Sequence, residues 1–425
     1  MRKIILILLM LIGSGPVVAD SVYDEIAEQY VRLVLALGVH DSGYVDAYYG
    51  PQQWLKKAQQ KKISLNSIIL ASDHILKYMT QLDPNDEMTK LRKNYLKTQL
   101  AALKSKAEIL DGRIKLDFDQ ESQALFDSIA PHFPMSDFDQ ALNALSENLP
   151  GDGSLAERAK AFKKQFFIPK DKLLEVFKIA IAECRKRTQQ YIDLPNNETF
   201  KLEFVTHKPW SGYNWYKGNS FSLIQVNIEH PIAISRAIDL GCHEGYPGHH
   251  TYNALLEKNL SKNRGWIEYS VYPLFSPQSL IAEGSANYGI ELAFPKDDKL
   301  TFEKEELFPI AGIDPNLAES YEKITKLLKK LKYVGNEIAR QYLDGKIDRK
   351  KAIELVQHYS LVDKKKAAQR VRFFDTYRSY VINYNWGNDM VKNWVESGKD
   401  KTQAAKWQRF KMLLSSPRLP SDLKI

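Results

Sequence analysis

The stretch "HEGYPGHH", residues 243–250, sets a proline between histidines in a part of the chain that otherwise has the pattern of a helix. In an uninterrupted helix the side chain of His249 would lie about 120° around the axis from that of His243. Pro247 prevents that helix, because it has no N–H to donate to the carbonyl of His243 and its ring clashes with that carbonyl. The two glycines of the stretch tolerate backbone angles that other residues resist. We therefore expect a two-residue bulge that returns His249 to the side of His243.

This bulge would restore a metal-binding pattern. Two histidines one helical turn apart, with a glutamate after the first, supply zinc ligands and a general base to a class of metallopeptidases. Here His243 and His249 are the candidate ligands, and Glu244 is placed to take a proton from a metal-bound water. His250 is available for substrate contact or for bonding to a ligand, or as the alternative second ligand if the loop closes differently.

A catalytic zinc ion needs a third protein ligand. The segment "SLIAEGSANYGIELA", residues 279–293, has the pattern of an apolar helix and carries Glu283, with Asn287 one turn further along the same face. A carboxylate on an apolar helix needs a partner, since burying an unpaired charge is costly. We expect Glu283 to be the third ligand and Asn287 to hold a ligand in orientation.

Peptide hydrolysis would also need a donor to the oxyanion that develops on the attacked carbonyl. Tyr380 and Tyr384 are candidates, because a four-residue spacing puts both on one helix face. His207, in a region expected to form strands, is a third. For each tyrosine the alternative is ordinary packing in an aromatic-rich core.

The rest of the chain indicates a mainly α-helical protein. Residues 23–38 and 85–112 have apolar positions at helical spacing, the second segment running from an Asn cap to a glycine. Residues 40–54 have the Gly and Pro of an aromatic loop, in which His40 is expected to be a structural hydrogen-bonding residue.

The pattern changes after Pro195. Residues 201–230 are rich in aromatic and β-branched side chains around Gly and Asn turns, which predicts a small β-sheet or hairpin just before the metal-binding helix. Helices are expected again after Pro231, including one over 351–360 and one over 376–396. The expected regions are a signal peptide at 1–19, a helical region at 20–195 and a catalytic region at 196–425, with the last two forming either separate parts or one structural unit.

The first residues have the pattern of a secretory signal. Arg2 and Lys3 precede an apolar run at 4–12, and small side chains offer a cleavage point before Asp20. The run is about half the roughly 20 residues that a membrane-spanning helix needs, and no cysteine ends the signal. We therefore expect an exported, periplasmic protein without a membrane or lipid anchor.

Charge and cysteine content limit the classes of function. The 60 basic and 52 acidic residues give a net charge of +8, which falls to +6 when the two basic residues of the signal are removed. The excess is spread along helices and lacks a compact basic and aromatic platform, so we do not expect nucleic-acid binding. Cys184 and Cys242 are expected to be two buried thiols, with a single bridge between them left open.

At the 243–250 stretch the sequence resembles a bacterial family known as domain of unknown function 885, and it is similar to zincin metallopeptidases whose third ligand is a glutamate. The family signature is His-Glu-x-x-Pro-Gly-His, and "AEGSANYG" stands in the place of its Glu-Gly-x-Ala segment. The likeness extends loosely to "SYVINYNWG", residues 379–387. The matching residues of the signature are His243, Glu244, Pro247, Gly248, His249 and His250. Departures are Ser285 and Asn287 in the glutamate segment and Thr251-Tyr252 after the histidines.

The resemblance implies a zincin-like, helix-rich metallopeptidase fold around a cleft, with one zinc ion. It also implies an edge strand, supplied from residues 203–227, that pairs with an extended peptide substrate. The function expected is that of an exported zinc-dependent peptidase. The alternatives are a metal-dependent hydrolase of a non-peptide amide or ester, and a catalytically weak binding protein on the same fold.

Overall fold

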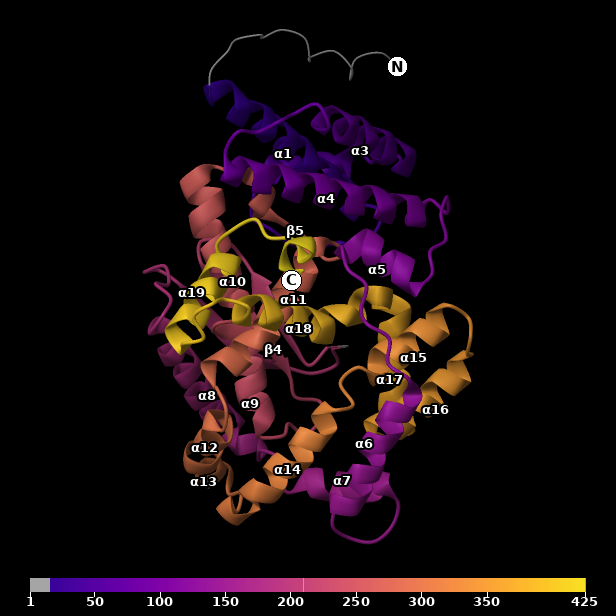
Figure 1. Cartoon of the computed structure of the whole chain (residues 1–425), viewed down its shortest axis with the longest axis vertical. Helices are drawn as coiled ribbons and strands as arrows, with labels where there is room; N and C mark the ends of the chain where they lie inside the picture. Colours follow the sequence, from indigo (N-terminus) through magenta and orange to yellow (C-terminus); the bar gives the residue numbers. More distant parts are fainter. Residues whose placement is uncertain (1–15, 209, 425) are drawn as a thin grey trace.

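The computed structural model describes residues 16–424 apart from Pro209, and it confirms a mainly α-helical fold with small sheets (Figure 1). Residues 1–15 of the expected signal peptide lie outside the described residues, and 16–19 begin the first helix. In the described part of the chain, none of the helices combines the length and apolarity that crossing a membrane requires.

The N-terminal helices pack through faces of buried apolar residues that recur every three or four positions. In α1 these include Tyr23, Ile26, Tyr30 and Val34, all at most 3% exposed. Figure 1 shows α1, α3 and α4 together at one end of the molecule and α6 and α7 at the other. The helices are α1 (Pro16–Gly38), α2 (Gln52–Gln60), α3 (Leu65–Met79), α4 (Glu87–Leu110), α5 (Phe118–Phe126), α6 (Met135–Asn148), α7 (Leu155–Lys164), the 3-10 helix η1 (Lys170–Lys172) and α8 (Leu173–Gln189).

Two details of this region differ from expectation. Helix α4 is capped by Asp86, whose side chain accepts a hydrogen bond from Thr89 N at 3.0 Å, and not by Asn85. Both residue types cap well, but the carboxylate also favours the positive end of the helix dipole. His40 is a structural residue as expected, with its Nε2 2.7 Å from the carbonyl of Ile63.

The strands after Pro195 form a three-stranded sheet of β2 (Thr199–Val205), β3 (Gly212–Tyr216) and β4 (Phe221–Asn227). The strand order is β2-β4-β3, with β4 antiparallel to β3 and parallel to β2. The expected hairpin is therefore β3–β4, and β2 pairs on its other side. This order leaves β3 as an edge strand within the range 203–227.

The segment 40–54 is not only a loop. It contains β1 (Val45–Tyr48), which pairs antiparallel with β5 (Val271–Pro273), and α2 begins at its end. The sequence could not show this pairing, because the partner strand lies more than 200 residues away. A buried ion pair also ties α4 to η4 (Ile267–Ser270), the turn just before β5, since Arg92 Nε lies 2.7 Å from Glu268 Oε1.

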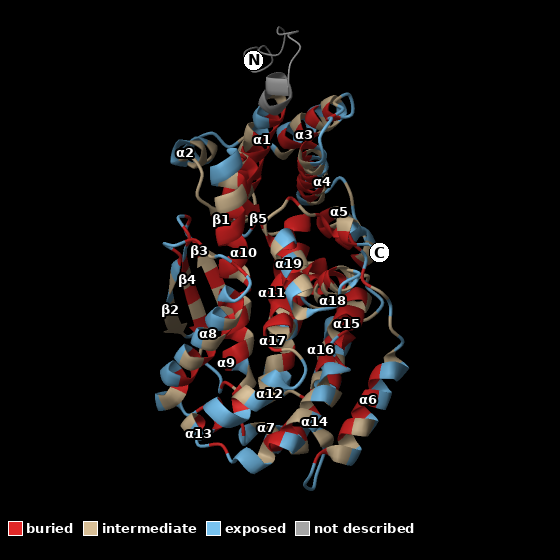
Figure 2. Ribbon diagram, turned by 60° about the vertical axis from the view of Figure 1, so that its left-hand side comes forward, coloured by how far each residue is buried: buried red, intermediate tan, exposed pale blue. Residues whose placement is uncertain are grey.

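The C-terminal helices surround one central helix, α11, which is buried along nearly its whole length (Figure 2). The expected continuous helix over 376–396 is wrong, because the chain leaves helical geometry at Arg378, whose φ is 50°. The elements are α9 (Ser235–Leu240), η2 (Gly241–Gly245), α10 (His249–Leu256), η3 (Glu257–Lys262), η4 (Ile267–Ser270), α11 (Pro277–Ala293), α12 (Asp298–Phe302), η5 (Glu303–Leu307), α13 (Phe308–Ala311), η6 (Pro315–Leu317), α14 (Ala318–Lys329), α15 (Val334–Leu343), α16 (Arg349–Ser360), α17 (Lys364–Tyr377), η7 (Arg378–Val381), α18 (Ile382–Glu396), α19 (Gln403–Leu414) and η8 (Pro420–Leu423).

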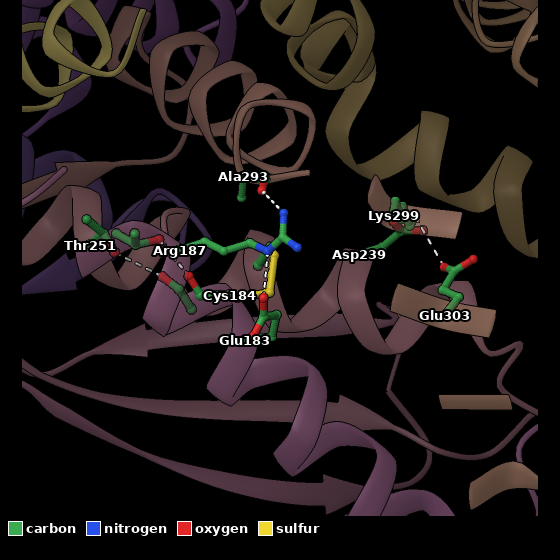
Figure 3. The surroundings of a disulfide bond; sticks show 11 residues. Glu183, Cys184, Arg187, Asp239, Thr251, Ala293, Lys299 and Glu303 are labelled. Atoms are coloured by element: carbon green, nitrogen blue, oxygen red, sulfur yellow. Dashed lines mark hydrogen bonds and ion pairs between the residues drawn. A yellow bond between two sulfur atoms is a disulfide. The ribbon is translucent and has the colours of Figure 1, made fainter. Parts of the chain in front are cut away.

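The two cysteines form a disulfide bond, so the expectation of two buried thiols is wrong. The bridge joins Cys184 of α8 to Cys242 of η2, directly before His243 (Figure 3). Beside it, Arg187 of α8 donates a hydrogen bond to the carbonyl of Ala293 at the end of α11, 2.9 Å away. The sequence could not decide the pairing, since it depends on α8 packing against a segment 58 residues further along.

Candidate metal centre

The chain breaks its helix at the place that Pro247 predicts. Helix α9 continues into the π-helical turn η2, residues 246–248 leave the helix, and α10 restarts at His249. The expected bulge is thus a widened turn followed by a three-residue break. Its backbone groups are satisfied, because Gly248 N donates to the carbonyl of Cys242 at 2.9 Å and Tyr252 N donates to that of Gly248 at 2.9 Å.

The break requires a glycine at position 248. A Cβ atom on Gly248 would lie 1.8 Å from the carbonyl oxygen of His243 and 2.4 Å from that of Cys242. Both are backbone atoms, which cannot rotate away as the end of a side chain could. The close approach brings the start of α10 back over the first histidine.

As a result, the donor atoms of His243 and His249 face one point, together with a donor atom of Glu283 on α11. His243 Nε2 and His249 Nε2 lie 3.1 Å apart, and Glu283 Oε2 of α11 lies 3.2 Å from the first and 3.6 Å from the second. A tetrahedral zinc ion with bonds of about 2.0 to 2.1 Å holds neighbouring donors roughly 3.3 to 3.4 Å apart. Glu283 Oε2 is buried without a hydrogen-bond donor among the described residues. The three donors therefore fit one divalent cation.

Two neighbouring side chains orient these donors. Asn287 Oδ1 lies 3.0 Å from His243 Nδ1, so this ring nitrogen donates its proton and Nε2 turns its lone pair to the centre. Tyr380 OH donates to Glu283 Oε1 at 2.8 Å. Burial raises the pKa of Glu283, but the His243 and His249 side chains beside it outweigh this and hold the pKa of the carboxyl well below its usual range. The carboxylate is thus charged when the site forms.

Glu244 lies beside the three donors, on the side of strand β3. Its carboxylate is also within 4.8 Å of the two histidine ligand atoms, so by distance alone it could replace Glu283 as a ligand. We assign the ligand role to Glu283, because its contacts are shorter and its Oε2 lacks any other partner. Burial raises the pKa of Glu244, against the opposing effect of His243 and His249. A base with a raised pKa suits proton transfer.

Strand β3 runs next to Glu244 and leaves room there. Asn214 Nδ2 donates to the backbone carbonyl of Glu244 at 2.6 Å. A Cβ on Gly212 would lie 2.8 Å from Glu244 Oε1, so the absence of a side chain keeps that carboxylate accessible. The edge strand and the candidate base share one wall of the same cavity.

His250 is not part of the centre. It is fully buried, with Nδ1 2.8 Å from Ser222 Oγ and Nε2 3.0 Å from Glu198 Oε2. Both ring nitrogens are therefore occupied in joining α10 to the sheet. The expectations that His250 contacts substrate, supports a ligand or replaces His249 are wrong, because the break turns only the first of the two adjacent histidines toward the centre.

The structure separates the three candidate oxyanion donors. The hydroxyl of Tyr380 is already bonded to Glu283, which makes it a positioning group. Tyr384 is 38% exposed, lines the cavity, and its ring lies 5.8 Å from that of Tyr380. His207 is not brought to the site: it lies in the exposed turn after β2 and is not among the residues that line the cavity.

Two residues beside the centre, Asp46 and Tyr213, were not predicted from the sequence. Asp46 of β1 lines the cavity and accepts a hydrogen bond from the hydroxyl of Tyr213 of β3. Burial raises the pKa of Asp46 to about 6, although the Tyr213 hydrogen bond and the charge of His249 oppose it. The only sequence signal was one acidic residue within the aromatic run "YVDAYY", nearly 200 residues before the signature.

The centre opens into a cavity of about 1710 Å³. Sites for single small molecules usually measure about 300 to 1,000 Å³, so this one is large enough for a longer ligand. Its walls include residues of β1, β3, α9, η2, α10, α11, α14, α17 and α18.

Comparison with known proteins reveals a similar fold but indicates no activity. No protein-family model and no curated protein matches the chain. Among solved structures it is similar to a candidate lipoprotein from Colwellia psychrerythraea, with 15% identity and a TM-score of 0.50 over 96% of this chain and 78% of that one. The BsuCP crystal structure has 10% identity and a TM-score of 0.45, covering 94% and 89%. The first likeness shows a shared fold, and at this identity it carries nothing about function.

Proposed function

We propose that this protein is an exported zinc-dependent peptidase with a zincin-like fold. The observation that carries the proposal is the convergence of His243 Nε2, His249 Nε2 and Glu283 Oε2 within 3.6 Å of one another. Two imidazoles and one carboxylate are the ligand set of a catalytic zinc that keeps an open position. Export rests on the expected signal peptide, and the disulfide bond is compatible with an oxidising compartment.

Each side chain has a role in hydrolysis. When bound, zinc acidifies water and polarises the attacked carbonyl. Glu244 takes the proton of the attacking water at a carboxylate oxygen and then gives it to the leaving nitrogen. Tyr384, which lines the cavity and whose hydroxyl has no hydrogen-bond partner among the described residues, donates to the developing oxyanion. Asn287 and Tyr380 hold His243 and Glu283 in place.

The peptide class of substrate is supported by strand β3. An edge strand beside the candidate base can pair with an extended chain and set its backbone across the centre. A hydrolase of small non-peptide amides would use neither this edge nor a cavity of about 1710 Å³. A binding protein on the same fold has no need of a carboxylate held free beside the metal ligands.

Metal analysis and a mixed peptide library test this function. We expect one zinc ion per chain in the wild type and in Glu244→Gln, and loss of zinc in Glu283→Gln. Removing the general base should lower the turnover of library peptides by about 100-fold or more. Equal turnover in the wild type and Glu244→Gln would rule out the role of Glu244, and absence of stoichiometric zinc in metal-replete wild type would end the proposal.

A further inference from the structure

One face of α17 forms a continuous wall of the cavity. The lining positions recur at helical spacing and run from the N-terminal to the C-terminal end of the helix: Lys366, Gln369, Arg370, Phe373, Phe374 and Tyr377. The C-terminal end reaches the metal centre, because the Tyr377 ring lies 6.0 Å from that of Tyr380, which holds Glu283. The N-terminal end lines the cavity further from the centre, where Arg370 is exposed and Lys366 is partly exposed.

That N-terminal end carries two cations that make no ion pair with the described residues. Among the described residues, no Asp or Glu lies within 4.0 Å of the charged groups of Lys366, Arg370 or the neighbouring Lys163 of α7. Arg370 donates only to Ser360 Oγ, at 2.6 Å. Burial and the charge of Arg370 lower the pKa values of Lys163 and Lys366, and at Lys366 the charges of Glu229 and Asp363 oppose this.

Three other cations of the same cavity are paired, whereas among the described residues Lys296, Lys329 and Lys401 make no ion pair within 4.0 Å. Lys332 lies 2.7 Å from Asp389, Lys392 lies 2.7 Å from Glu291, and Lys406 lies 3.0 Å from Glu396. The end of α17 is distinguished by two such cations, Lys366 and Arg370, which lie one turn apart on one helix face and whose charges affect each other. Like charges close together in a partly enclosed site repel, and an anion between them would remove that repulsion.

We propose that Arg370 and Lys366 bind a carboxylate of the peptide substrate, at a fixed number of residues from the bond that is cleaved. This inference rests on the proposed peptidase function. A planar guanidinium beside a lysine suits a carboxylate, which it can bind with two parallel hydrogen bonds. Phe373 and Phe374 between the charges and the centre provide apolar surface for the intervening side chains.

The helix sets the distance. From Tyr377 to Arg370 is seven residues, or about 10.5 Å along the axis, and to Lys366 eleven residues, or about 16.5 Å. An extended peptide advances about 3.3 Å per residue. The carboxylate therefore lies roughly three to five residues from the centre. It can be the free C-terminus of a short peptide or an Asp or Glu side chain at that position.

Peptide binding without turnover tests the inference. Fluorescent peptides of four to nine residues, as free acids and as C-terminal amides, would be titrated into full-length Glu244→Gln protein with and without zinc. We expect one length of free acid to bind about 10- to 100-fold more tightly than its amide. Arg370→Ala and Lys366→Ala in this background should each reduce that preference.

Lys365→Ala is the matched control, because Lys365 is an exposed neighbour on α17 that does not line the cavity. It removes the same charge and should keep the preference, and thermal unfolding checks that each variant folds. Amidated peptides with one Glu moved along the chain identify the source: rescue at one position assigns a side chain, and no rescue assigns the C-terminus.

Equal affinity for acids and amides at every length, or a preference unchanged in both Arg370→Ala and Lys366→Ala, overturns the inference. Since binding is measured without cleavage, failure of the wild type to hydrolyse any peptide would count against the proposed function and leave this result separate.

Discussion

At the scale of single residues, the metal centre depends on two glycines that have no side chain. Gly248 has no Cβ where the carbonyl of His243 passes, and Gly212 has none where the Glu244 carboxylate lies. The helix break at Pro247 can be predicted from the sequence alone. Which histidine then returns to the centre depends on how closely the backbone folds back on itself. The close approach at Gly248 therefore lets His249, and not His250, join His243 and Glu283 at the candidate metal centre.

Gly248→Ala should destabilise the fold and disrupt the centre. The new methyl group cannot fit 1.8 Å from a backbone oxygen, so the α10 start must move, at a cost of about 2 to 4 kcal/mol in free energy of unfolding. Denaturant unfolding measures this. Gly335→Ala in α15 is the control, since its Cβ would meet nothing within 4 Å and should leave stability unchanged or raise it slightly. Similar effects of the two changes would contradict the argument.

Asn287→Ala should weaken zinc binding without unfolding the protein. Loss of the acceptor frees the His243 ring to rotate or change tautomer, which typically costs about 10- to 100-fold in metal affinity. Competition with a chromophoric chelator measures the dissociation constant. Asn287→Asp keeps an acceptor at the same place and should bind zinc more tightly than the alanine variant; equal affinities in wild type and Asn287→Ala would show that the contact does not orient the ligand.

At the scale of elements, the third ligand is placed by the crossing of α11 and α18. A Cβ on Gly284 would lie 2.4 Å from the backbone of Gly387, so the two helices touch main chain to main chain. This contact sets Glu283, the residue before Gly284, against Tyr380 in η7. The helical pattern of 279–293 predicted α11 but did not reveal which helix it would cross.

Gly284→Ala should separate α11 from α18 and weaken both stability and zinc affinity. We expect a loss of about 2 kcal/mol or more, since the obstacle is backbone. The neighbouring Ser285→Ala removes only a hydroxyl bonded within its own helix and should change little. Thermal unfolding with and without zinc distinguishes them: if Gly284→Ala unfolds at the wild-type temperature in both conditions, the close crossing is not needed.

At the scale of the whole molecule, segments far apart in sequence converge on one cavity. Strand β1 brings Asp46, β3 brings the edge beside Glu244, and α17 brings Arg370. The disulfide bond joins α8 to η2, the turn that contains His243. The cavity is therefore a product of the complete chain.

Removing the bridge should lower global stability. Closing a separation of 58 residues restricts the unfolded chain by about 4 kcal/mol in the chain-entropy model. The double variant Cys184→Ala with Cys242→Ala should unfold at a lower denaturant concentration than the oxidised wild type. Reductant should lower the midpoint of the wild type but not of the double variant. A wild type that is insensitive to reductant would show that the bridge contributes nothing to stability.

The sequence by itself determined the local features: mainly α-helical structure, strands after Pro195, a break at Pro247, and the identity of His243, His249 and Glu283 as candidate donors. These follow from periodicity and from residues such as proline whose constraints act on their own neighbours. Tertiary structure alone decided that His250 faces the sheet, that Asp46 joins the cavity, that His207 stays outside, and that the cysteines are bonded. Such outcomes depend on contacts between segments tens to hundreds of residues apart, which one sequence does not encode in any local pattern.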